Sequence, residues 1–84
     1  MLTKRDRTAL YKQIQETQRT RALNVRAAMH SAGGWEELGH LCGLSPAFLK
    51  QIASDNAQRS IGERLARKLE FDLGVPKGWL DSRH

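Results

Sequence analysis

The chain has 84 residues, of which 39% are hydrophobic and 27% are charged, and its formal net charge is +5. This length suits one compact domain with a single small core. The hydrophobic residues form no run long enough to span a bilayer, and the first residues lack the apolar stretch of a secretory signal. We therefore expect a cytoplasmic protein with no membrane contact.

The cysteine content points in the same direction. One cysteine, Cys42, cannot form an internal disulfide, as is usual in a reducing compartment. Cys42 and the three histidines, His30, His40 and His84, have no recognisable zinc-ligand spacing. The sequence also lacks paired carboxylates, a nucleophile with a base, or a phosphate-binding loop at recognisable spacing. We therefore expect no metal, no cofactor and no enzyme activity.

The positive charge is concentrated at the start of the chain. Residues 1–26 hold seven basic and two acidic side chains, a net charge of +5, whereas residues 27–84 hold seven of each sign. A local surplus of this kind suits a polyanion such as nucleic acid, and it also suits an ordinary solvated helix face. Charge alone leaves both interpretations open.

The sequence predicts helices and no convincing strand. Neither glycine nor proline interrupts residues 6–31, which fit one long helix or two. An early apolar patch, formed by Leu10, Tyr11 and Ile14, is followed by the polar run 15–21 before apolar residues return. We expect a bend or fraying within that run.

Shorter helices follow the glycine pair at residues 33–34. The first covers WEELGHLC, residues 35–42, and ends at Gly43. The second begins at Ser45, a good N-cap, and Pro46 follows in the first helical position. Proline is favourable there because the N–H that it lacks would have no partner within the helix. Two short helices joined by a tight turn that contains glycine are typical of a helix-turn-helix.

The remainder predicts a loop and two further helical segments. Residues 54–59 are polar and indicate the loop, after which Ser60 and Glu63 have the spacing of a capping box. A stripe of apolar residues at every fourth position follows: Ile61, Leu65, Leu69 and Leu73. Gly74 ends this helix. Residues 75–81 predict a last helical turn that closes the core with Val75, Trp79 and Leu80.

The segment WEELGHLCGLSPAFLKQIAS, residues 35–54, has small or apolar side chains wherever two crossing helices must touch. These are Leu38, Gly39, Gly43, Leu44, Leu49 and Ile52. The segment resembles the helix-turn-helix of the phage lambda repressor and Cro-like family (Cro/C1 type). The ending ARKLEFDLGVPKGWLD is similar to that of small phage, prophage and plasmid regulators.

The resemblance implies an all-α fold in two parts. Residues 22–84 are expected to form a lambda-repressor-like five-helix domain with its helix-turn-helix, and residues 1–21 an extra basic N-terminal helix for which the family gives no counterpart. Two positions depart from the family. Gly34 stands where Ser or Thr commonly caps the first motif helix, and Gly39 stands where alanine is common.

The resemblance also gives residues 46–53 the role of recognition helix, whose N-terminal part enters the major groove of DNA. Leu49 and Ile52 are expected to face inward. The residues left on or near the outer face, and expected to contact bases, are Ser45, Pro46, Ala47, Lys50 and Gln51. Lysine can donate to guanine and glutamine can bond adenine, although both side chains also suit ordinary solvated positions.

Contacts outside the base edges are expected from two places. The candidates for phosphate contact are in or beside the loop and in the basic segment: Ser54, Asn56, Arg59, Arg19 and Arg21. For the apolar patch of Leu10, Tyr11 and Ile14 we favour a dimer interface. A phosphate-binding arm and a merely solvated extension are the alternatives.

The resemblance thus predicts a sequence-specific transcriptional regulator of double-stranded DNA, acting as a homodimeric repressor on a palindromic operator. The alternative is a helix-turn-helix protein-interaction module, such as an antitoxin or adaptor. The two differ in their response to salt and to DNA sequence, because operator binding depends steeply on both.

Overall fold

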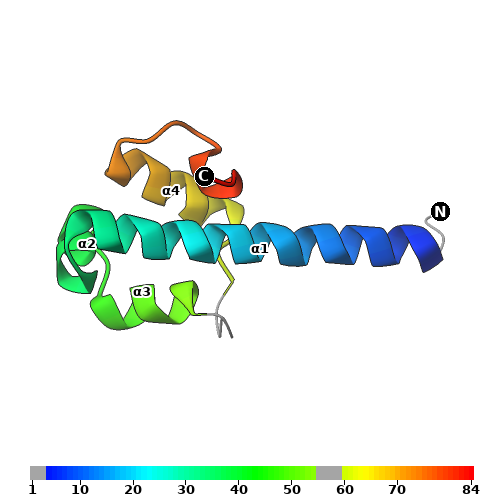
Figure 1. Ribbon diagram of the computed structural model, residues 1–84, viewed down its shortest axis with the longest axis horizontal. Coiled ribbons are helices and arrows are strands. Elements are labelled where there is room, and N and C mark those ends of the chain that lie inside the picture. Colours follow the sequence, from blue (N-terminus) through cyan, green and yellow to red (C-terminus); the bar gives the residue numbers. More distant parts are fainter. Residues whose placement is uncertain (1–3, 55–59) are drawn as a thin grey trace.

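A computed structural model describes residues 4–54 and 60–84, and all regular secondary structure within them is helical. The elements are α1 (Lys4–Ala32), α2 (Trp35–Cys42), α3 (Pro46–Ala53), α4 (Glu63–Leu73) and a 3-10 turn, η1 (Trp79–Asp81) (Figure 1). The prediction of an all-α fold is confirmed.

Helix α1 is one unbroken helix of 29 residues. The prediction of a bend or fraying within residues 15–21 was wrong. The run contains neither glycine nor proline, and its glutamine, glutamate and arginine side chains are good helix formers, so polarity alone does not interrupt the helix. The expected boundary between residues 21 and 22 falls inside α1, and the division into extension and domain stays a prediction.

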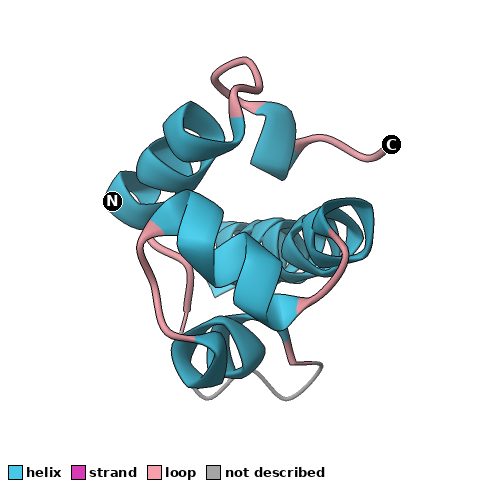
Figure 2. Cartoon of the chain, turned by 90° about the vertical axis from the view of Figure 1, so that its left-hand side faces the viewer, coloured by secondary structure: helices cyan, strands magenta, loops and turns pink. Residues whose placement is uncertain are grey.

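The two halves of α1 have different surroundings. The C-terminal half packs against α2, α3 and η1, while the N-terminal half projects beyond them (Figure 1). Figure 2, seen from the α2 end, shows the shorter helices gathered around the packed half. Every described side chain from Arg5 to Glu16 is exposed. The core therefore lies at one end of the longest helix.

The core consists of apolar side chains from all four helices and the segments around α4. Its largest members are at most 1% exposed: Val25, Leu38, Leu49, Ile52, Ile61, Leu69 and Leu80. Trp35 and Trp79 pack against this cluster. Cys42 is also buried, and this burial raises the pKa of its thiol.

The start of α4 differs from the prediction. The helix begins at Glu63, and its N-cap is Gly62, which has no side chain to make a cap hydrogen bond. The capping box of Ser60 and Glu63 was therefore wrong. Glu63 instead forms an ion pair with Arg21 of α1, at 3.0 Å between Oε2 and Nη2. Its other carboxylate oxygen, Oε1, pairs with Arg67 at 3.2 Å, so both oxygens have partners other than the backbone of residue 60.

Polar side chains of α1 hold the segment that leads into α4. The Nε2 of Gln18 donates to the carbonyl oxygen of Ile61 at 3.1 Å, and the N–H of Ile61 donates to the Gln18 Oε1 at 2.8 Å. Arg21, 6% exposed, donates to the same carbonyl at 2.8 Å and pairs with Asp81 as well as Glu63. The segment that leads into α4 is thus fixed to α1 and not only to α4.

A second set of polar contacts fixes η1. Glu70, 2% exposed, accepts N–H bonds from Gly78 at 3.0 Å and Leu80 at 2.9 Å, and it pairs with Arg67 at 3.0 Å. Asn24 of α1 donates to the carbonyl oxygen of Leu80 at 2.8 Å. A buried carboxylate needs such partners, because its desolvation is otherwise costly.

Candidate nucleic-acid interface

The turn between α2 and α3 has the geometry that a helix-turn-helix requires. Gly43 has φ +65° and ψ +32°, a left-handed conformation that favours glycine. Ser45 caps α3, since its Oγ accepts the N–H of Phe48 at 3.2 Å, and Pro46 is the first helical residue. The predicted roles of Gly43 in ending α2, and of Ser45 and Pro46 in starting α3, are confirmed.

The start of α2 shows the expected departure from the family. Gly34 has φ +146° and provides no side-chain cap. Two acidic residues, Glu36 and Glu37, lie in the first turn, where a negative charge is favourable near the helix N-terminus. The helix therefore begins without the side-chain cap that Ser or Thr would give.

Helix α3 buries its apolar side and leaves a polar side in solvent. Leu49, Ile52 and Ala53 are at most 1% exposed, as the inward positions require. The predicted base-contacting residues are exposed except for the half-buried Pro46: Ser45, Ala47, Lys50 and Gln51. Residues 47, 50 and 51 have i, i+3, i+4 spacing, so they share one face of the helix. Figure 1 shows α3 at the edge of the molecule.

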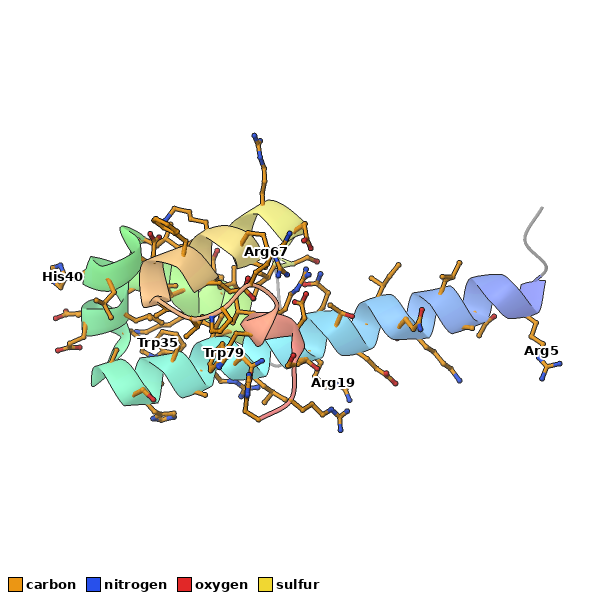
Figure 3. The ribbon with its side chains drawn as sticks, turned by 90° about the horizontal axis from the view of Figure 1, so that it is seen from above. Arg5, Arg19, Trp35, His40, Arg67 and Trp79 are labelled. Carbon is orange, nitrogen blue, oxygen red and sulfur yellow. The ribbon has the colours of Figure 1, made fainter. Side chains whose placement is uncertain are left out.

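The residues predicted to contact phosphates lie in different surroundings. Ser54 is half-buried at the end of α3, while Asn56 and Arg59 lie outside the described residues. Arg19 is exposed and points away from the other helices in Figure 3. Arg21 is buried, with its guanidinium bound by Asp81 and Glu63. We no longer count Arg21 among the phosphate contacts, because its donors serve the fold.

The predicted dimer patch lies on the projecting half of α1. Leu10 is 44% exposed and Ile14 60%, whereas the side chain of Tyr11 lies outside the described ones. Residues at alternating intervals of four and three continue from this patch into the domain: Ile14, Gln18, Arg21, Val25, Ala28 and Ala32. The patch is therefore the uncovered end of the stripe with which α1 faces the core.

The part of the chain that the structure describes contains neither a metal-ligand cluster nor a membrane-spanning helix. No group of three or more His, Cys, Asp or Glu side chains there could hold a metal ion. None of the described helices combines the length and the apolar character needed to cross a membrane.

Comparison with known proteins gives two kinds of relative. The chain is 30% identical over 64 residues to the prophage repressor CohE of Escherichia coli K12, which covers 76% of this chain and 29% of the repressor. It is 36% identical over 69 residues to the imidazoleglycerol-phosphate dehydratase of Neisseria meningitidis serogroup B (strain MC58), which covers 73% of this chain and 23% of the enzyme. The chain thus spans less than a third of the length of these relatives. No family model matches, and no solved structure gives a significant match.

Proposed function

We propose that this chain is a sequence-specific DNA-binding regulator that reads an operator with α3. The observation that carries the proposal is the exposed face of Ala47, Lys50 and Gln51, presented at the edge of the molecule behind the capped turn at Gly43 and Ser45. Lysine and glutamine provide the donors and acceptors that read guanine and adenine in the major groove. The similarity to a prophage repressor supports the same function.

We further propose that regulation is repression by occupancy of the promoter. This mode needs only a bound domain that obstructs polymerase, and it agrees with the name of the prophage relative. The similarity to the dehydratase covers less than a quarter of that enzyme and carries no proposal of dehydratase activity for this chain.

The proposal includes a homodimer formed through the apolar patch. One recognition helix covers few base pairs, whereas a two-fold pair of helices about 34 Å apart reads a palindrome. The residues beside the patch, Thr8, Gln15 and Thr17, are uncharged. These three flanking positions therefore add no like-charge repulsion between two copies.

A protein-interaction module is the second candidate, and one observation favours it. Phe71 on α4 is 84% exposed, and it lies beside the half-buried Val75 in a shallow hollow of the surface. Large exposed aromatic side chains are common where proteins bind one another. This surface is compatible with DNA binding by α3, since the two lie on different elements.

The deciding experiment is selection of DNA from a random pool, followed by footprinting on the DNA beside the chain's own gene. We expect one enriched palindromic sequence, whose affinity exceeds that of random DNA by at least about 10³-fold and falls steeply with salt. Weak retention that is the same for all sequences would favour the protein-interaction module.

A further inference from the structure

The surplus charge of the chain does not lie on the helices that would approach the operator. Residues 27–84, which include α2, α3 and α4, carry seven charges of each sign, and the whole surplus of +5 lies within residues 1–26. Long-range attraction to a polyanion must therefore come mainly from α1.

Three basic residues form a line along α1, which we name the basic stripe: Arg5, Lys12 and Arg19. All three side chains are exposed. They are seven residues apart, close to two helical turns, so they share one face at intervals of about 10.5 Å. The stripe is therefore a rigid row of cations about 21 Å long.

No member of the basic stripe forms an ion pair with a described carboxylate. Inside the domain, Arg21, Arg67 and Lys68 each pair with an acidic side chain. One described carboxylate, Glu16, lies on the same exposed face, four residues after Lys12 and three before Arg19, and forms no ion pair with either. The stripe is thus available to an external anion.

The basic stripe also faces away from the patch and from the other helices, and its last member, Arg19, shares a surface hollow with the C-terminal residues Arg83 and His84. Lys12 is two residues from both Leu10 and Ile14, which places it about 200° around the helix from each of them. Figure 3 shows Arg5 and Arg19 on the side of α1 that faces away from the other helices. A second copy on the apolar patch would therefore leave the stripe uncovered.

The position of α3 separates the stripe from any DNA that α3 reads. The buried side of α3 packs toward α1 and α2, so its exposed side faces away from α1. A duplex lying against Ala47, Lys50 and Gln51 is then on the far side of α3 from α1. The stripe is not directed at that duplex, so Arg19 is assigned here to a different DNA segment from the operator.

We propose that the basic stripe binds the phosphate backbone of a second segment of duplex DNA, without reading its sequence, so that one molecule holds two segments. A row of evenly spaced cations on a stiff helix suits a polyanion with regularly spaced phosphates. Only the first segment, bound by α3, rests on the proposed function. The sequence-independent contact stands on α1 alone.

The test uses the full chain and two charge-matched variants. In Lys12→Gln/Arg19→Gln the stripe loses two cations, and in Arg64→Gln/Lys77→Gln two exposed cations are lost elsewhere, so both variants fall from +5 to +3. Glutamine is a good helix former, so α1 is preserved. Each protein is titrated with a random duplex at several salt concentrations. The immobilised selected duplex is then tested for capture of a labelled random duplex.

We expect the stripe variant to show a salt dependence shallower by about 1.8 log units per log unit of salt, from 0.9 for each of two phosphate contacts. The amount of labelled random duplex that it captures should also fall at least about fivefold. The control variant should keep both properties of the unmodified chain.

Several outcomes would overturn the inference. Equal losses in both variants would assign the effect to net charge, and no loss in either would leave the stripe without a role in DNA binding. Binding to vesicles rich in anionic lipid that only the stripe variant loses, with duplex binding unchanged, would identify a membrane surface instead. If no sequence is selected but the salt slope still falls in the stripe variant, the proposed function fails and the sequence-independent contact stands.

Discussion

Gly39 lies so close to the backbone of Leu44 that a Cβ added to residue 39 would be 2.5 Å from the Leu44 carbonyl oxygen. This is the point at which α2 passes the turn that leads into α3. The resembled family commonly has alanine here, and glycine lets the two helices of this chain approach more closely. The departure from the family is thus matched by a local change in packing.

Replacing Gly39 by alanine should therefore destabilise the fold. The clashing atom is a backbone oxygen, which cannot move aside as a flexible side chain could, so we expect the unfolding free energy to fall by about 1 to 3 kcal/mol. Denaturant unfolding measures this. Gly62→Ala is the comparison at a position where a Cβ meets no atom within 4 Å; its cost is limited to that of alanine at the N-cap of α4, so its loss of stability should be smaller. Similar stabilities for the two variants would contradict the close approach.

Gly43 provides a test of the turn that does not involve packing. Its φ is +65°, and a Cβ at this position would meet no atom within 4 Å, so the cost of a side chain comes from the backbone alone. Gly43→Val should lower the free energy of unfolding by about 1 to 2 kcal/mol. Gly43→Asn should lose less, because asparagine adopts the left-handed conformation more readily than other residues. Equal thermal midpoints for both variants would show that φ is not limiting.

The turn could be predicted from sequence because its signals are local. Glycine after one helix, and Ser-Pro before the next, act on their own backbone and need no distant partner, as Gly43 and Ser45 confirm. The inward positions of Leu49 and Ile52 also define the outer face of α3 by spacing alone. That is why the candidate base contacts, apart from the half-buried Pro46, were found in exposed positions.

The polar network could not be predicted in the same way. Helical spacing does place Arg21 on the face of Val25 and Ala28, and this was a usable signal for its burial. Its partner Asp81 is 60 residues away, and no local pattern connects the two. The same long-range pairing removed Glu63 from the expected capping box. Interactions between distant segments therefore account for the misassigned phosphate contact, and together with the local pair of Glu63 and Arg67 they explain the absent capping box.

The ion pair of Arg21 and Asp81 predicts a pH dependence of stability. The hydrogen bond from Arg21 holds the pKa of the Asp81 carboxyl below its ordinary value, against the opposing effect of burial. A carboxyl with a lowered pKa stabilises the folded state above its unfolded pKa, near 3.9, and this contribution is lost as the pH falls through that value and below. We therefore expect the thermal midpoint of the unmodified chain to drop between about pH 5 and pH 3.

Asp81→Asn separates this contribution from the titration of other groups. The variant should have a lower midpoint at pH 7, because Arg21 is left buried with fewer charge partners, and a smaller decrease of the midpoint on acidification. Circular dichroism across the pH range measures both. Asp72→Asn, which removes the more exposed pair with Lys68, serves as the comparison. An unchanged pH profile in Asp81→Asn would contradict the assignment.

Lys50 and Gln51 should carry the sequence preference of α3. Replacing either by alanine removes donors to base edges, so affinity for the selected operator should fall by about 1 to 3 kcal/mol and preference should relax at one or two base pairs. Binding titrations on the operator and on single-base variants measure this. Lys77→Ala and Gln13→Ala are matched controls at exposed positions outside α3. Unchanged operator affinity in both α3 variants would contradict the proposed readout.

The apolar patch predicts the state of association. Leu10 and Ile14 are exposed in the single chain, and a second copy that covers them would gain their burial. Light scattering should therefore show a dimer for the unmodified chain and a monomer for Leu10→Gln/Ile14→Gln, in which the helix is retained because glutamine is a good helix former. Operator affinity should fall with the loss of two-site binding.

The control for this experiment lies on the same helix. Leu23 is 50% exposed but lies on a different face of α1 from Ile14, Arg21 and Val25. The Leu23→Gln variant should therefore remain dimeric. A deletion of residues 1–15 should reproduce the monomer while keeping Gln18, whose hydrogen bonds fix Ile61. A deletion that extended through residue 18 would also release that segment and confuse the two effects. If the double variant stays dimeric, the dimer interface lies elsewhere. The basic stripe is then the remaining candidate for a binding surface on the projecting half of α1.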